Sequence, residues 1–224
     1  MRIETIQLKG FQDGVECKTS LYSSIESFLP VDFTFVAGNT YALISDFGCG
    51  SWGLSTCLLG RGTSKYTGEL YLNQKIIGAS ELSKYACCVA EPIFPQVNTT
   101  NNLGTPKECI CRALELSKLP YHVDEIKSKF FLSDNRFERP LEYCSGEIWP
   151  ISVAINYALG KQVFCFPWLN MITISRFEYF YDSKIIHLLT DEGKIVVVPS
   201  SQKKVLKRKC DHVIYFLKGK IVYR

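Results

Sequence analysis

Residues 41–60, YALISDFGCGSWGLSTCLLG, place a strand, a glycine-containing turn and the start of a helix in direct succession. The first four residues, Tyr41–Ile44, form an apolar run that suits a short buried strand. Gly48 and Gly50 follow in the turn, where glycine permits backbone conformations that other residues avoid. Backbone N–H groups are therefore expected to gather at a helix N-terminus just after Gly50. The stretch predicts a layered α/β arrangement with this turn at the end of a strand.

The same stretch has the spacing of a phosphate-binding loop, G-x-x-x-x-G-K-[ST], without the reactive residues of that loop. Ser45 stands at the first glycine, Ser51 at the lysine, and Trp52 at the hydroxyl residue that ligates magnesium. Of the motif's small residues, Gly48 and Gly50 remain. We expect a nucleotide-binding type of fold in which this loop does not handle ATP in the usual way.

The composition is that of an ordinary globular protein. The chain has 224 residues, 46% of them hydrophobic and 21% charged, which is enough for one large core. We expect one domain, or one domain with an inserted lobe. The net charge of +4 is too mild for the concentrated basic face of a nucleic-acid-binding protein. The first ten residues, MRIETIQLKG, contain no apolar leader, and no run approaches the ~18 apolar residues of a membrane span.

The ten cysteines do not predict a metal site. The chain has no C-x-x-C pair and only three histidines, His122, His187 and His212, so a zinc site is not expected. Cys88 and Cys165 lie in apolar runs that suit strands. We expect the cysteines to be mainly small buried hydrophobic residues in a reducing compartment.

Strands and helices alternate along the chain, which favours an α/β fold. The strands predicted first are 3–8, 33–36, 41–44, 69–72 and 85–89. Gly38-Asn39, between the second and third of these strands, is typical of a hairpin turn. Helices are predicted at 107–119, 122–131, 146–159 and 176–189, later strands at 163–166, 194–198 and 213–217, and a tight hairpin at 218–222. The middle helices indicate an inserted lobe, about 96–154, within a core formed by 1–95 and 155–224.

The order and spacing of these segments resemble those of the ATP-binding subunit of an ABC transporter over nearly the whole chain. Gly68–Asn73 is similar to a glycine-containing hairpin of that family, and 89–95 is similar to its Q-loop, with Glu91 at the glutamine position. Residues 143–147 resemble the signature motif L-S-G-G-Q/E ahead of a helix, in either of two registers one residue apart. The signature-like residues are Cys144, Ser145, Gly146 and Glu147.

Further landmarks of the same family fall in the last third of the chain. Residues 163–166 are similar to the Walker B strand, which the family ends with Asp-Glu, but here Pro167 and Trp168 follow. Ser200 stands where the family has its switch histidine. Residues 210–221, CDHVIYFLKGKI, are close to the family's closing strands. The resemblance implies a P-loop ATPase fold, with a mixed and mainly parallel sheet, an N-terminal antiparallel β part and an inserted helical lobe.

The substitutions at the landmarks imply a pseudo-ATPase. By resemblance, Ser51, Trp52, Pro167, Trp168 and Ser200 replace a phosphate-binding lysine, two magnesium ligands, a catalytic base and its helper. The loss of one charge-assisted contact costs ~1.5–3 kcal/mol, so the loss of several weakens binding by orders of magnitude. We expect no catalytic residue, no metal and no nucleotide in the chain's own site. The indole of Trp52 is expected in the space of the phosphate, either as core packing or as the wall of a rebuilt pocket.

The resemblance also implies partners. Subunits of this family pair head to tail, so the signature of one chain completes an ATP site on the loop of the other. We expect a second, different and intact cassette chain that holds Mg-ATP at the shared site. We also expect a transmembrane subunit, contacted through the helical lobe and Glu91, which would hold this chain at the cytoplasmic face of the membrane.

Two alternatives from other classes remain open at this point. An enzyme could have rebuilt the emptied pocket for another ligand, using Ser51, Ser200 and Glu91 as a polar cluster. A free-standing module could bind protein partners without any transporter. Cys144 beside Ser145 is a poor candidate for a nucleophile, because no histidine is near it in the sequence.

The shared-site hypothesis makes a prediction about Ser145, whose alternative role is only to cap a helix. If Ser145 presents its hydroxyl and N–H to a γ-phosphate held by the partner, Ser145→Phe should lower the partner's ATPase rate about tenfold or more. The measurement is the steady-state rate of phosphate release from the assembled pair. An unchanged rate would favour the capping role.

Overall fold

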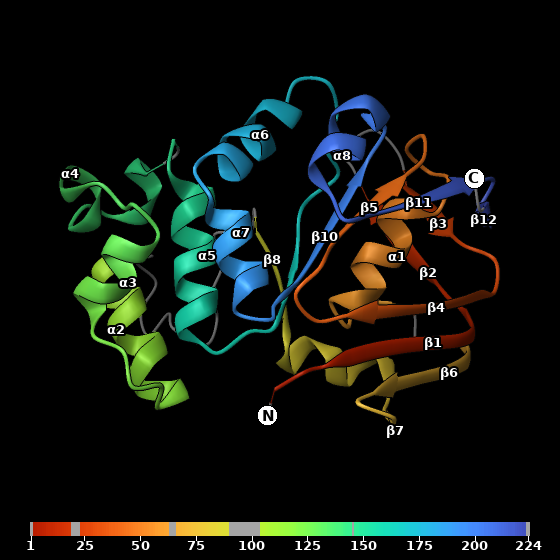
Figure 1. Cartoon of the computed structure of the whole chain (residues 1–224), viewed down its shortest axis with the longest axis horizontal. Coiled ribbons are helices and arrows are strands. Elements are labelled where there is room, and N and C mark those ends of the chain that lie inside the picture. The colour runs from red at the N-terminus through yellow and green to blue at the C-terminus, as the bar shows by residue number, and fades with distance from the viewer. Residues whose placement is uncertain (1, 19–22, 63–65, 90–103, 145, 223–224) are drawn as a thin grey trace. The chain divides into compact units, whose positions relative to one another are not determined.

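The structure, a computed structural model, describes residues 2–18, 23–62, 66–89, 104–144 and 146–222 (Figure 1). It divides into a core unit, Met1–Cys87 with Gln162–Arg224, and a helical unit, Cys88–Lys161. The helical unit is wider than the lobe expected at 96–154. It extends to Lys161 because helix α5 (Ile148–Ala158) packs on other helices of this unit. Within the described ranges, no helix combines the length and apolar character that crossing a membrane requires.

A six-stranded sheet forms the centre of the core unit, in the order β12-β11-β5-β10-β9-β8. Strand β10 pairs in parallel with both β5 and β9, and β5 pairs in parallel with β11. Every residue of β5, β9 and β10 is buried, as expected for central strands with both faces covered. The bounds are β5 Thr40–Ile44, β8 Ala86–Cys88, β9 Val163–Cys165, β10 Ile195–Ser200, β11 His212–Leu217 and β12 Lys220–Val222.

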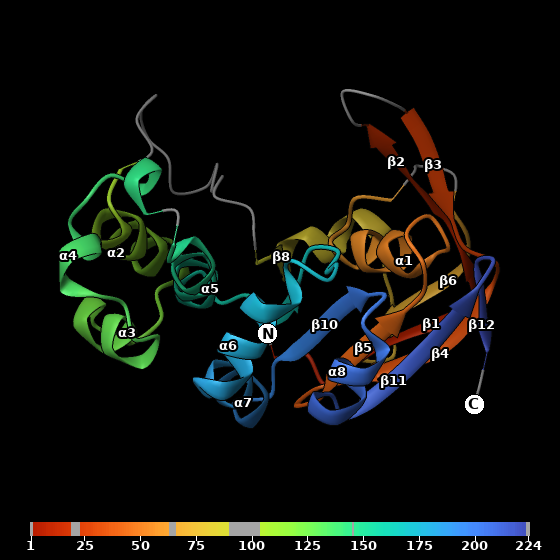
Figure 2. The ribbon, with the colours of Figure 1, turned by 90° about the horizontal axis from the view of Figure 1, so that it is seen from above.

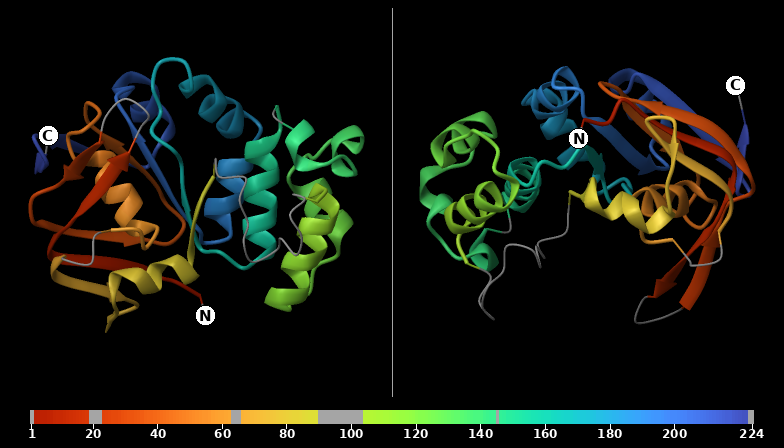
Figure 3. Two further views of the ribbon diagram at one scale, coloured as in Figure 1. Left: turned by 180° about the vertical axis from the view of Figure 1, so that it is seen from behind. Right: turned by 90° about the horizontal axis from the view of Figure 1, so that it is seen from below.

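Helices cover both faces of this sheet. Helix α1 (Ser51–Leu58) lies on one face, and α7 (Ile185–Asp191) and α8 (Lys203–Lys209) lie on the other, as Figures 2 and 3 show. Helix α6 (Ile174–Asp182) packs against α7. The last turn of α8 is basic, and the Lys209 ammonium pairs with the Asp182 carboxylate at 2.7 Å.

The N-terminal part of the core unit is antiparallel. Strands β1 (Thr5–Gln12), β4 (Val31–Val36), β6 (Thr67–Leu72) and β7 (Lys75–Ile76) form a sheet in the order β4-β1-β6-β7. Strands β2 (Gly14–Lys18) and β3 (Ser23–Ser27) form a separate two-stranded ribbon that packs on α1. A 3₁₀ turn, η1 (Ala79–Lys84), also contacts α1. The fold class expected from the sequence, an antiparallel N-terminal part with a mixed sheet, is confirmed.

The first described helix of the helical unit, α2 (Pro106–Ser117), begins with a capping box. The Thr105 hydroxyl accepts the Glu108 N–H, the Glu108 carboxylate accepts the Thr105 N–H, and Pro106 occupies the first helical position. Lys118, with φ of 56°, ends the helix in the left-handed region. The bounds are α2 Pro106–Ser117, α3 Val123–Lys129, α4 Asp134–Phe137 and the 3₁₀ turn η2 Leu141–Tyr143.

Two local predictions were wrong and one was confirmed. The Gly38-Asn39 turn does not close a hairpin, because β4 pairs with β1 while β5 enters the other sheet between β10 and β11. The single helix predicted at 176–189 is two helices, because Lys184 adopts a left-handed conformation with φ of 64°. The closing hairpin is present, with β11 and β12 paired antiparallel through Lys218 and Gly219 at positive φ.

An aromatic cluster joins the two larger sheets of the core unit. The ring of Tyr41 in β5 packs edge-on against Phe33 and Phe35 of β4, and stacks on His212 of β11. The Tyr41 hydroxyl accepts the Val36 N–H at 2.7 Å, and burial raises the pKa of the phenol. Its position therefore depends on packing and on a polar contact to the end of β4.

We expect Tyr41→Phe to lower the free energy of unfolding by about 1 kcal/mol, because the Val36 N–H loses its acceptor while the ring packing remains. Urea unfolding followed by circular dichroism measures the change. Tyr179→Phe, at a ring that is 59% exposed, is the matched control and should leave stability unchanged. Equal stabilities of the two variants would contradict the assigned contact.

Candidate functional site

The loop between β5 and α1 has the backbone form that its glycines predict. Gly48 and Gly50 have φ of 83° and 105°, and α1 begins at Ser51. Both angles lie in the left-handed region, where a side chain strains the backbone. The loop begins beside β10, since the Ser45 N–H donates to the Ser200 carbonyl at 3.2 Å. The turn therefore presents N–H groups from the end of a parallel strand and the first turn of a helix.

The acceptor for these N–H groups is a side chain of the same protein. One carboxylate oxygen of Glu26, Oε1, accepts from the N–H of Gly50 at 2.8 Å and from those of Trp52 and Gly53 at 3.1 Å each. Glu26 lies in β3 and is 2% exposed. Its other oxygen, Oε2, is buried without a hydrogen-bond partner in the described structure. We call the three N–H groups the amide nest, and Glu26 fills it.

Close backbone contacts enclose the filled nest. A Cβ added at Gly53 would lie 3.1 Å from the Glu26 carbonyl oxygen, so a side chain at residue 53 would press on β3. A Cβ added at Gly50 would lie 3.1 Å from the Gly219 Cα and 3.2 Å from Phe28 Cβ. The Gly219 N–H donates to the Cys49 carbonyl, which ties the closing hairpin to the loop.

The serines at the expected reactive positions are engaged within the fold. The hydroxyl oxygens of Ser45 and Ser51 are 2.6 Å apart, and the Ser45 hydroxyl also donates to the Asp46 carbonyl at 2.7 Å. The Ser200 hydroxyl donates to the Leu169 carbonyl at 2.6 Å and accepts the Gln202 N–H. Ser51 and Ser200 are fully buried. These hydroxyls hold the loop and the neighbouring strand ends in place.

The indoles of Trp52 and Trp168 both lie beside the ring of Phe47. The ring of Phe47 is 6.0 Å from that of Trp52 and 5.4 Å from that of Trp168, centroid to centroid, and Phe47 is 42% exposed. Trp52, Trp168 and Pro167 are half-buried. The group that fills the nest is one that the sequence did not predict, the Glu26 carboxylate.

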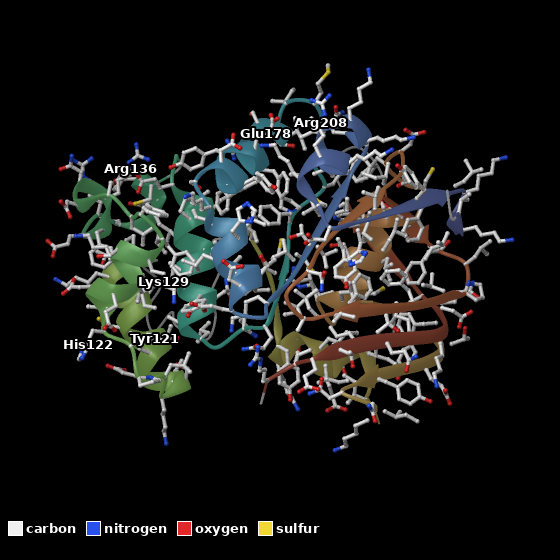
Figure 4. The ribbon with its side chains drawn as sticks, viewed as in Figure 1. Tyr121, His122, Lys129, Arg136, Glu178 and Arg208 are labelled. Atoms are coloured by element: carbon white, nitrogen blue, oxygen red, sulfur yellow. The ribbon has the colours of Figure 1, made fainter. Side chains whose placement is uncertain are left out.

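The described signature-like residues, Cys144, Gly146 and Glu147, lie in the helical unit just before α5. The Cys144 thiol is buried and donates to the carbonyls of Arg136 and Pro140, and burial raises its pKa, which suits a structural role. The Glu147 carboxylate accepts the Ser133 hydroxyl at 3.0 Å. Arg136, labelled in Figure 4, borders this turn, where a Cβ added at Gly146 would meet its guanidinium at 2.7 Å.

Two of the predicted residues, Glu91 and Ser145, lie outside the described residues. Within the described part, no group of three or more His, Cys, Asp or Glu side chains is placed to hold a metal ion. A pocket of about 260 Å³ borders the loop on its strand side. Its lining consists of Ile44, Ser45, Asp46, Ser201, Lys203, Tyr215, Phe216, Leu217 and Val222, and includes none of the three amide-nest residues.

Sequence reasoning missed Glu26, although one signal was present. Gly53 follows Trp52 inside the first turn of a helix, where glycine is unfavourable by roughly 1 kcal/mol relative to alanine. A glycine at such a place indicates close approach of another backbone, and β3 is that backbone. The partner itself could not be predicted, because Glu26 lies 27 residues away in the sequence.

Comparisons with known proteins agree with the architecture. No protein-family model matches the chain, and no curated protein matches it by sequence. It is similar to the solved structure of cbiO1 from Clostridium perfringens, described as part of the ABC transporter complex cbiONQ. The TM-score is 0.69 at 12% identity, covering 99% of this chain and 88% of that one.

A second solved structure, a bacterial Atm1-family ABC exporter with ATP bound, is similar with a TM-score of 0.64 at 13% identity. That match covers 99% of this chain and 38% of the exporter chain. The chain therefore has the fold of ABC transporter ATP-binding cassettes.

The close approach of β3 predicts an unusual response at Gly53. A glycine-to-alanine change within a helix normally stabilises it by up to ~1 kcal/mol, but here the new Cβ would press on the Glu26 backbone. We expect Gly53→Ala to lower the free energy of unfolding by about 1–2 kcal/mol. The measurement is chemical denaturation.

Gly78→Ala is the matched control, because Gly78 has φ of −73° and an added Cβ would have no atom nearer than 3.8 Å. It should change stability by no more than about 0.5 kcal/mol. A stabilising Gly53→Ala would show that β3 does not press against α1.

Proposed function

We propose that the chain is a catalytically silent ATP-binding-cassette subunit that serves a transporter complex as a structural element. The observation that carries the proposal is the Glu26 carboxylate in the amide nest at the start of α1. In a loop of this form, such N–H groups hold the phosphates of a nucleotide. A nucleotide phosphate would compete with a negative charge that is already tethered and buried there.

The residues around the nest also favour a silent site. Ser51 supplies no cation where a phosphate-binding lysine is expected, and its hydroxyl bonds to Ser45. At the end of β9, Pro167 and Trp168 supply no carboxylate for magnesium or for a water molecule. Ser200 keeps its hydroxyl on the Leu169 carbonyl. Binding and hydrolysis of Mg-ATP would therefore lack the charges on which they depend.

The fold supplies the rest of the proposal. The cbiO1 structure is described as part of a transporter complex, and the present chain has the same kind of fold. We infer that this chain pairs with a second, nucleotide-binding cassette and with a transmembrane subunit at the cytoplasmic face of a membrane. In that assembly it would complete a Mg-ATP site on the partner through the turn that contains Gly146. It would also transmit closure of the pair to the transmembrane subunit.

The enzyme alternative has less support in the described residues. It requires free polar groups that converge on the emptied site, but the hydroxyls of Ser51 and Ser200 are buried and engaged. The pocket beside the loop brings Asp46 and Lys203 to one cavity, but Lys203 lies over the Tyr215 ring at 4.8 Å. We therefore favour the structural subunit.

The silent site predicts no response to nucleotide. Mg-ATP at about 5 mM should raise the melting temperature of the purified chain by less than about 1 °C, whereas a functional site would be stabilised by RT ln(1 + [L]/Kd). Trp52, whose backbone N–H belongs to the nest, contributes to the tryptophan fluorescence, which gives an independent reading of the same titration. Magnesium alone, and ADP, are the ligand controls.

A saturable shift with Mg-ATP, or steady ATP hydrolysis by the chain alone, would overturn the silent-site proposal. The transporter assignment has its own test, which is co-purification of the tagged chain with an intact cassette and a multi-span membrane protein. Recovery of the chain as a free monomer from native membranes and cytosol would contradict that assignment.

A further inference from the structure

We propose that Glu26 is a built-in substitute for a phosphate group, which holds the loop in its anion-bound form, and that its removal reopens the amide nest to inorganic phosphate. The inference rests on the proposed function, because it treats the nest as a former phosphate site. It goes beyond that function because it names the group that occupies the site, Glu26, and the ligand, inorganic phosphate, that would bind once Glu26 is removed. The ligand class is a small tetrahedral oxyanion.

The hydrogen-bond pattern is that of a bound anion. A single oxygen of Glu26 accepts three N–H groups, at 2.8, 3.1 and 3.1 Å, from the residue before α1 and from its first turn. Converging N–H groups at a helix N-terminus are the arrangement by which proteins bind phosphate oxygens. All three donors are backbone N–H groups, so the nest forms without the lysine side chain of a phosphate-binding loop.

Glu26 is buried, and the N–H groups of the nest are the polar groups that contact its carboxylate in the described structure. The side chain is 2% exposed, and none of the ion pairs among the described residues involves it. A buried carboxylate without compensation is costly, and the N–H dipoles of the turn and helix supply that compensation here. Its second oxygen, Oε2, has no hydrogen-bond partner, so the nest is the polar contact that the carboxylate makes in the described structure.

Backbone contacts hold the segment that carries Glu26, through β2 on one side and α1 on the other. Glu26 is paired with Val15 in the β2–β3 ribbon, and the next residues bond onward, Phe28 N–H to the Asp13 carbonyl and Leu29 N–H to the Gly219 carbonyl. Gly53 gives β3 the room to approach α1. The backbone that carries Glu26 is therefore tied to β2 and to the closing hairpin, and it lies close to α1.

The test is to remove the carboxylate and offer phosphate. Glu26→Ala leaves the three N–H groups of Gly50, Trp52 and Gly53 without their acceptor. We expect inorganic phosphate to raise the melting temperature of this variant saturably, by at least about 3 °C at ten times Kd. The wild-type chain should show only the small, non-saturating rise that phosphate causes in proteins generally.

Matched variants and salts separate site binding from that general effect. Glu4→Ala removes an exposed glutamate of the same unit and should behave as the wild type. Sodium chloride at equal ionic strength should stabilise none of the variants saturably. A phosphate response of Glu26→Ala that equals that of the wild type, or a saturable response of the wild type itself, would overturn the proposal.

A second measurement remains decisive if Glu26→Ala does not fold. Glu26→Gln keeps the shape of the side chain and removes its charge. The amide-proton resonances of Gly50, Trp52 and Gly53 should then move upfield together, because charge-assisted hydrogen bonds become neutral ones. Unchanged resonances would show that Glu26 does not act as an anion in the nest.

The two proposals fail in different ways. If the wild type ignores Mg-ATP and Glu26→Ala ignores phosphate, the silent cassette stands and the phosphate-substitute inference is overturned. If the wild type binds Mg-ATP saturably and loses the Glu26 hydrogen bonds on binding, the silent-site proposal is overturned, and so is the claim of a fixed occupant.

Discussion

The hydrogen bonds from the Glu26 carboxylate to the N–H groups of Gly50, Trp52 and Gly53 are the constraint on which the rest of the site depends. A loop that gathers backbone N–H groups at a helix N-terminus must satisfy them, and in a buried position water cannot do so. Here the β2–β3 ribbon supplies the acceptor. The loop is consequently complete without a ligand, and the ribbon is anchored to α1 by the same contact.

The surroundings of the loop follow from this anchoring. Glu26 occupies the nest, and the Ser51 hydroxyl forms a hydrogen bond with the Ser45 hydroxyl. Ser200 likewise joins the end of β10 to the segment at Leu169. The indoles of Trp52 and Trp168 are left to pack on Phe47 at the surface of the core unit. The hydroxyls of Ser45, Ser51 and Ser200 thus make contacts within the loop and at the strand ends.

A cassette that is complete without nucleotide suits a supporting role. The fold shared with cbiO1 and with the Atm1-family exporter carries the sheet, the loop and the helical unit. At the places where the resemblance expects a lysine and acidic residues, this chain has Ser51, Pro167 and Trp168. The Glu147 carboxylate, just before α5, accepts the Ser133 hydroxyl within the helical unit.

Local sequence was sufficient for the architecture. Apolar runs such as Val163–Phe166, the capping box at Thr105, and the Gly48 and Gly50 turn each determine a short stretch of backbone from neighbouring residues, and their order along the chain predicts the α/β layers. Other features depend on residues far apart in the sequence. The separation of β4 from β5 into two sheets, against the hairpin signal between them, follows from the burial of both faces of β5. The contact of Glu26 with the amide nest likewise exists only once β3 lies on α1, because no local pattern links a strand glutamate to a loop 24 residues away.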